Sequence, residues 1–209
     1  MTERINCKSG FTLIEMIGVV AIIAILSAFI TPKVFEVIED SKVTRFAGEV
    51  STYTAAVTNW YKDIGSLRSM RSNGVLTATD TSFQVELMDN QGSTPTTGFW
   101  ARWNGPYIDS VSNISLGTAL TIESRVGSTS TGPPAAGNST TFDLNDDNAN
   151  DMANKQVVAI RLSGVTLGQF TKIDSILDRG LTAANNQTSG KVKYTTAGGG
   201  RVYIYIASL

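Results

Sequence analysis

Residues 143–154 carry oxygen donors at the spacing of a calcium-binding loop. Side-chain or main-chain oxygens fall at relative positions one, three, five, seven, nine and twelve, which are in order Asp143, Asn145, Asp147, Ala149 (through its main-chain carbonyl), Asp151 and Asn154. Asn148 stands where such loops favour glycine, and Asn154 replaces the bidentate glutamate. Asparagine can adopt the positive φ that the sixth position requires, so a Ca²⁺ site is one interpretation of these residues. The other is a solvated turn closed by its own Asp and Asn side chains.

A single acid interrupts the most apolar part of the chain. From Phe11 to Ile30, 16 of 20 residues are apolar, and Glu15 is the only charged one. A lone carboxylate near the centre of a bilayer costs about 2.5–3.5 kcal/mol on insertion scales, so it usually has a partner. Glu15 therefore either meets a cation or is tolerated near the membrane interface.

The composition argues against several other functions. The 209 residues contain 17 Lys+Arg, 18 Asp+Glu, one Cys and no His, a net charge of −1. No nucleic-acid partner is predicted from this charge, and histidine-based catalysis and cysteine-cluster metal sites are excluded. The motifs Gly-x-Ser-x-Gly and Ser-x-x-Lys are absent from the sequence. We therefore expect no enzyme and no required cofactor; a membrane-anchored enzyme with a carboxylate pair assembled by the fold is a remote alternative.

The apolar run predicts a membrane-spanning helix over residues 11–31. Twenty helical residues reach roughly 30 Å, about the thickness of the hydrocarbon core. The preceding leader, residues 1–10, carries Arg4 and Lys8 against Glu3, so the positive-inside rule keeps it in the cytoplasm. An ordinary secretory signal peptide is disfavoured because the run is long and lacks an Ala-x-Ala cleavage site.

The residues Gly10-Phe11-Thr12-Leu13-Ile14-Glu15, followed by the apolar run and Pro32, resemble the class III signal sequence of type IV pilins and type II secretion pseudopilins. The resemblance implies cleavage between Gly10 and Phe11 by a prepilin peptidase, with N-methylation of Phe11. It also implies that Pro32 lies within one long curved helix that takes part in assembly. It covers roughly the first fifty residues.

This resemblance implies a filament subunit that is stored in the bacterial inner membrane and then assembled into a type IV pilus-like fimbrium on the cell surface. A periplasmic pseudopilus of a secretion machine and a minor pilin are the alternatives. The implied partners are further copies of the chain, the peptidase, an assembly platform and an ATPase. Cleavage would create an amine on Phe11 that the Glu15 carboxylate of a neighbouring subunit could neutralise, which favours register more than stability.

Residues 32–64 are expected to continue as an amphipathic helix half. Pro32 removes a backbone donor and would kink the helix or end it locally. Apolar residues then recur at mostly helical spacing, namely Val34, Ile38, Phe46, Val50, Tyr53, Val57, Trp60 and Ile64. Gly65 should end the helix.

The head, residues 65–209, is expected to complete an α+β, pilin-like fold, in which the long helix packs on an antiparallel sheet. The strands are predicted at residues 114–122, 157–162, 192–194 and 201–207. A short extra helix should lie between the second and third strands, capped by Thr166 and stopped by Gly180, and residues 197–200 should form a hairpin turn.

Three further segments of the head have predicted roles. Residues 83–88 read as a short helix or strand, and the aromatic residues 98–108 as a packed loop over one end of the core. Residues 124–141 contain Ser, Thr, Gly, Pro or Asn at 14 of 18 positions, which predicts an exposed mobile loop.

Overall fold

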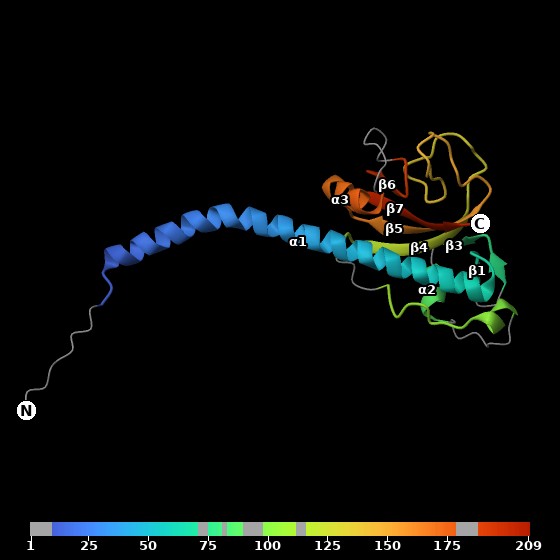
Figure 1. Cartoon of the computed structure of the whole chain (residues 1–209), viewed down its shortest axis with the longest axis horizontal. Coiled ribbons are helices and arrows are strands. Elements are labelled where there is room, and N and C mark those ends of the chain that lie inside the picture. The colour runs from blue at the N-terminus through green and yellow to red at the C-terminus, as the bar shows by residue number, and fades with distance from the viewer. Residues whose placement is uncertain (1–9, 71–74, 81–82, 90–97, 112–115, 179–187) are drawn as a thin grey trace, which may run out of the picture. The chain divides into compact units, whose positions relative to one another are not determined.

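A computed structural model of the chain describes residues 10–70, 75–80, 83–89, 98–111, 116–178 and 188–209. Within these ranges the fold is α+β, as the sequence predicts: a long helix, a five-stranded antiparallel sheet and short additional helices (Figure 1). The elements are α1 (Leu13–Ile64), β1 (Ser69–Met70), β2 (Leu76–Thr77), β3 (Thr79–Asp80), α2 (Phe83–Met88), the 3₁₀ helix η1 (Gly98–Arg102), β4 (Ala119–Val126), β5 (Gln156–Ser163), α3 (Leu167–Leu177), β6 (Val192–Thr195) and β7 (Arg201–Ser208).

Helix α1 is continuous over 52 residues and includes Pro32. The expectation that Pro32 would end the helix locally is therefore wrong, because the missing N–H costs one hydrogen bond while the neighbouring turns persist. The Thr31 hydroxyl donates to the Ser27 carbonyl at 2.7 Å in the same turn. The predicted stop is confirmed: Gly65 has a φ of +77°, and its N–H donates to the Tyr61 carbonyl at 2.8 Å.

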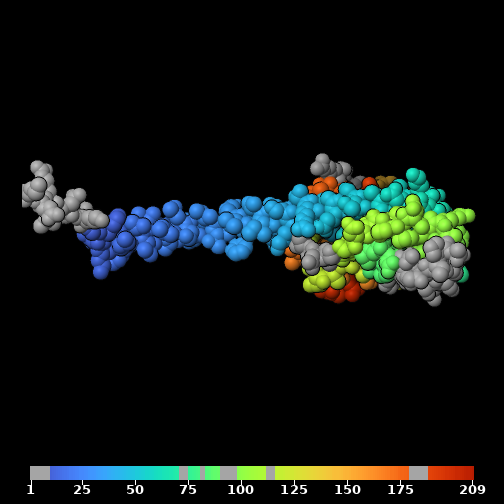
Figure 2. Space-filling model, turned by 90° about the horizontal axis from the view of Figure 1, so that it is seen from below, coloured from blue at the N-terminus to red at the C-terminus, as the bar shows by residue number. Residues whose placement is uncertain are grey.

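The two halves of α1 differ in burial. Contacts divide the chain into a unit of residues 1–41 and a unit of residues 42–209. Residues 10–42 are exposed throughout the described part, and Figure 2 shows the blue surface of the first unit. Val34 and Ile38, predicted to belong to the packed stripe, are 48% and 44% exposed, so that prediction is wrong for both. Burial begins at Val43, one turn before Phe46.

The sheet has the strand order β3-β4-β5-β7-β6, with all neighbours antiparallel. One face packs against the second half of α1 (Figure 1), with side chains such as Ile122, Ile160 and Ile204 in one cluster with Phe46 and Trp60. The period of two along each strand places the intervening residues on the opposite face. A second, smaller cluster forms there, containing Phe142, Met152, Val157, Ala159 and Tyr203.

The strands predicted in the C-terminal half are confirmed as β5, β6 and β7, but the strand predicted at residues 114–122 is displaced. Residues 112–115 lie outside the described residues, and β4 runs from Ala119 to Val126. Gly117 has a φ of +77°, and a Cβ there would lie 2.4 Å from the Ser163 carbonyl oxygen. This close turn delays the start of the strand, a feature that alternation of apolar residues does not reveal.

The prediction that residues 124–141 form an exposed loop is wrong at both ends of the segment. Ser124 is buried in β4, where its hydroxyl donates to the Leu67 carbonyl at 2.6 Å. Residues 139–141 are also buried, and the Ser139 hydroxyl donates to Glu123 Oε2 at 2.8 Å. The end of this segment covers the second face of the sheet. Its burial is tolerated there because its small hydroxyl residues form hydrogen bonds with buried charged groups such as Glu123.

Lys193 joins this covering segment to the edge strand β6. Its side chain is fully buried, and Nζ donates to the carbonyl oxygens of Ala135 at 3.1 Å, Asn138 at 2.5 Å and Thr141. Nζ also lies 4.4 Å from the centre of the Phe142 ring. Burial lowers the pKa of Lys193 to about 7, whereas the carbonyl contacts favour its charged form.

The short elements of the C-terminal half follow the predicted local signals. Thr166 caps α3, as expected, and the structure adds a reciprocal capping box with Gln169. The helix ends at Leu177 with Asp178 as its C-cap, before Gly180, which lies outside the described residues. The hairpin turn between β6 and β7 is confirmed, with positive φ at each of its three glycines, residues 198–200.

Replacing Lys193 with Met should destabilise the head by about 2–4 kcal/mol, because three carbonyl oxygens would lose the charged donor that is buried among them. Denaturant unfolding of the full chain in detergent micelles measures this change. Lys155→Met, at an exposed lysine directly before β5, is the control and should change stability by less than about 0.5 kcal/mol. Equal stability of the two variants would contradict the role assigned to Lys193.

Candidate functional site

The first candidate site is the start of α1. Gly10 and Phe11 precede the helix and are exposed, with Phe11 at 77%. The rest of the predicted leader, including Cys7, lies outside the described residues. The large apolar side chains that follow, from Leu13 to Ile38, are each 44–78% exposed. The helix also contains a stretch long and apolar enough to cross a membrane.

Glu15 and Thr12 form a reciprocal pair at this helix start. The Thr12 N–H and hydroxyl donate to Glu15 Oε2 at 2.8 Å and 2.7 Å, and the Glu15 N–H donates to Thr12 Oγ1 at 3.4 Å. This is the geometry of a capping box, which satisfies main-chain donors that have no partner within the helix. The sequence reasoning gave Thr12 no such role, although the Thr-x-x-Glu spacing ahead of an apolar run signals it.

The second candidate site is the loop at residues 143–154. Asp143 is fully buried, and its carboxylate accepts from the N–H of Asp147 at 3.1 Å and of Asn148 at 2.8 Å. The Asn145 side chain accepts from the Asp147 N–H at 3.2 Å, and Asp151 Oδ2 accepts from the Leu144 N–H at 2.7 Å. The structure thus brings the first three predicted donors into one turn, in which main-chain N–H groups occupy part of their capacity.

The backbone of this loop has the positive φ expected at Asn148, and Asn150 also takes part in the hydrogen bonds of the loop. Asn148 has a φ of +62°, as the sharp turn at the sixth position requires, and Asn154 also has a φ of +62°. Asn150, outside the predicted donor set, accepts from the N–H of Phe142 and Met152. Within the described ranges no group of three or more acidic, His or Cys side chains is placed to hold a metal ion. Calcium binding stays a prediction.

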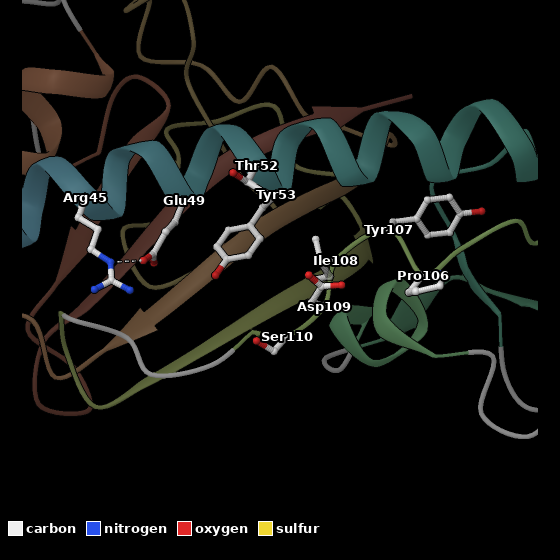
Figure 3. Close-up of a pocket in the computed structure, with 9 residues that line it drawn as sticks. All are labelled: Arg45, Glu49, Thr52, Tyr53, Pro106, Tyr107, Ile108, Asp109 and Ser110. Carbon is white, nitrogen blue, oxygen red and sulfur yellow. Dashed lines mark hydrogen bonds and ion pairs between the residues drawn. The ribbon is translucent and has the colours of Figure 1, made fainter.

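The third candidate site is an open groove of about 410 Å³ beside α1 (Figure 3). Its lining residues are Arg45, Glu49, Thr52, Tyr53, Pro106, Tyr107, Ile108, Asp109 and Ser110. Arg45 Nε and Glu49 Oε1 lie 3.1 Å apart and neutralise each other along one wall. The groove therefore offers polar contacts rather than a nucleophile with an adjacent base.

The aromatic segment beside the groove is packed, as predicted. Trp100 is 1% exposed, and the Tyr107 ring lies edge-on to the rings of Trp60 and Trp103 at 6.0 Å and 5.9 Å. The Tyr107 hydroxyl donates to Asp63 Oδ2 at 2.9 Å. Burial raises the pKa of Tyr107 to about 12, and the Asp63 contact also raises it. Tyr107 therefore stays protonated and ties this segment to α1.

Comparison with known proteins identifies the N-terminal segment. The prokaryotic N-terminal methylation motif matches residues 5–31, which include Gly10, Phe11 and Glu15. The N-terminal segment of the chain is similar to that of type IV pilins.

Two similar proteins from Moraxella bovis bear pilin names. The type IV major alpha-pilin and fimbrial protein Q are each 44% identical to this chain over 52 residues. The match covers 25% of this chain and 33% of each relative, so the chain spans about a third of the length of these curated relatives. No solved structure matches the chain.

Replacing Thr12 with Val should remove the hydroxyl that caps the start of α1 and destabilise its first turn by about 1 kcal/mol. Amide hydrogen exchange of the full chain in micelles should then be faster at residues 12–16. Thr58→Val, at an exposed hydroxyl in the second half of α1, is the control. Unchanged exchange at residues 12–16 would show that the pair does not stabilise the helix start.

Proposed function

We propose that this chain is a structural subunit of a type IV pilus-like filament. The observation that carries the proposal is the methylation motif at residues 5–31, which overlaps an apolar helix whose side chains are exposed. A helix that is apolar on all sides needs a bilayer or other apolar helices around it. After the subunit leaves the membrane, a filament core built from several copies of residues 11–31 supplies these apolar surroundings.

In this proposal the precursor is held in the inner membrane with residues 1–10 in the cytoplasm. A prepilin peptidase cuts between Gly10 and Phe11 and methylates the new amine. An assembly platform and an ATPase then add the subunit to a filament of identical chains, which reaches the cell surface. The chain acts as a structural element rather than as an enzyme.

Glu15 has a specific role in this assembly. Cleavage places an amine on Phe11, four residues before Glu15, at the same end of an apolar helix. In a bundle of parallel helices, the Glu15 carboxylate of one subunit neutralises the amine of the next. Until that partner arrives, Thr12 satisfies the carboxylate within the chain. Charge pairing in apolar surroundings penalises a misplaced subunit, because each unpaired ion is costly to bury. Pro32 lies inside the continuous helix α1, which in this proposal packs in the core of the filament.

A type II secretion pseudopilin and a minor pilin are the alternatives, because each would share the same N-terminal segment. The names of the two Moraxella bovis relatives, a major pilin and a fimbrial protein, favour a pilus subunit. Sheared surface fibres made of this chain would support the pilus subunit. Loss of protein export in its absence, without such fibres, would support the pseudopilin.

Replacing Glu15 with Ala or Leu should leave membrane insertion intact and abolish filament growth. Membrane fractionation, electron microscopy of sheared fibres and N-terminal sequencing of the mature chain measure these effects, and the wild type should begin with N-methylphenylalanine. Glu39→Ala, at an exposed acid of the same helix, should assemble normally. Normal filaments from the Glu15 variants would refute the assembly role, and an uncleaved wild-type chain would refute the processing step.

We also propose that residues 143–154 bind calcium. The donor spacing and the positive φ of Asn148 support this, with Asp143, Asn145, Asp147, Asp151 and Asn154 as side-chain ligands and Ala149 as a carbonyl ligand.

Calorimetry of the full chain in micelles should show heat on addition of millimolar Ca²⁺ together with a higher melting temperature. Asp147→Asn keeps an acceptor for the Ala149 N–H but removes one charge, so it should weaken the response about tenfold or more. The absence of both heat and a melting shift in the wild type would end the calcium proposal.

A further inference from the structure

A buried acid in α2 lies outside all the sites described above. Glu86 is 2% exposed, and its Oε2 accepts from the Met70 N–H at 2.6 Å. Its Oε1 lies 2.5 Å from Ser69 Oγ, and the same Ser69 Oγ lies 2.9 Å from Asp80 Oδ2. These four residues, called the Glu86 network below, join β1, β3 and α2.

The number of protons in this network is too small for two ionised acids. A serine hydroxyl carries one proton, and an ionised carboxylate can only accept. Ser69 Oγ nevertheless lies within hydrogen-bond distance of two carboxyl oxygens. One of the two contacts therefore needs a proton from a carboxyl group. Glu86 is the natural holder, because it is buried whereas Asp80 is half-buried.

We propose that Glu86 is protonated in the folded chain below neutral pH and donates to Ser69, which in turn donates to Asp80, so that loss of this one proton loosens the contact among β1, β3 and α2. The ionised form would set two negative groups against a single hydroxyl proton. The carboxyl of Glu86 thus joins β1, β3 and α2 through hydrogen bonds that depend on pH.

Within the part of the chain that the structure describes, the elements packed against Glu86 contribute little other charge. Strand β4 faces this region with Leu120, Ile122 and Ser124, and α1 contributes Trp60 and Ile64. Glu123 and Arg125 of β4 alternate with these residues and point to the other face of the sheet.

The aromatic segment also packs against α2. The Trp103 indole N–H donates to the Glu86 carbonyl oxygen at 3.0 Å, and the Tyr107 hydroxyl is bonded to Asp63 of α1. Among the described residues, Asp80 is the charged group that acts on Glu86.

The protonation of Glu86 has a defined effect on stability against pH. Burial raises the pKa of Glu86 from 4.5 to about 7, the contacts with Ser69 and Met70 lower it, and the charge of Asp80 raises it. The folded chain thus holds this proton roughly 300-fold more tightly than the unfolded chain. The stabilisation is fully present below about pH 4.5 and is lost as the pH rises through about 7.

The network also reaches the aromatic segment. The carbonyl oxygen of Leu87, next to Glu86, accepts from the N–H of Tyr107 at 2.8 Å and of Ile108 at 3.3 Å. Movement of α2 on deprotonation would therefore be passed to the segment that lines the groove of Figure 3. This connection gives the head a region that responds to pH, made of β1, β3, α2 and the aromatic segment.

The test is infrared spectroscopy of the full chain in micelles between pH 5 and 9, with thermal unfolding at the same pH values. Wild type minus Glu86→Gln should show one protonated carboxyl band that persists at pH 6 and is lost near pH 7. Glutamine can donate to Ser69 as the protonated acid does, so the variant should keep its melting temperature between pH 6 and 8 while the wild type loses several degrees. Glu39→Gln, at an exposed acid, should behave as the wild type.

Asp80→Asn gives an independent readout. An asparagine amide can donate to Ser69 Oγ, which frees the serine proton for an ionised Glu86, so the midpoint of band loss should fall by about one pH unit or more. The absence of a band at pH 6 that depends on Glu86, or an unchanged pH dependence in Glu86→Gln, would overturn the proposal. If Glu86→Gln does not fold, an unchanged midpoint in Asp80→Asn overturns it.

Discussion

The rest of the structure depends on α1 burying only its second half within the chain. From Val43 to Ile64 one face of the helix fills the core of the head, whereas residues 10–42 are exposed throughout the described part. The exposed apolar surface of the first half cannot be stable in water, so it requires a bilayer or other helices. In the proposed function, membrane storage and filament assembly are two ways of meeting that same requirement.

On the second face of the sheet, the head contains buried polar groups beside its smaller apolar cluster. Glu123 and Lys193 lie on the same face of the sheet, and each binds the segment that covers it, through Ser139 and through three carbonyl oxygens respectively. Arg161 Nη1 lies 2.8 Å from Glu123 Oε1 and compensates its charge. Such contacts hold the covering segment, which is rich in Ser, Thr and Gly, in one position. If the segment were displaced, a buried charge would be left without hydrogen-bond partners.

Acidic groups have three different environments in this chain. Glu15 lies in an apolar helix and pairs within its own turn, Asp143 accepts main-chain N–H groups in a tight loop, and Glu86 lies between a serine and a main-chain donor. The surroundings and not the residue type distinguish the proposed roles of these acids, which are assembly for Glu15 and proton retention for Glu86, from the turn formation seen at Asp143. The low overall charge of the chain reveals none of these differences.

The apolar helix, its methylation motif, its end at Gly65 and three of the strands follow from the sequence alone, because each depends on neighbouring residues or on a short repeating pattern. Tertiary structure decided where burial on α1 begins, how Ser139 and its neighbours become buried, and what Glu86 contacts. Lys193 and Thr141 are 52 residues apart, and Glu86 and Ser69 are 17 apart. Such partners meet only after the strands pair and the helices pack, so local patterns of polarity do not specify them.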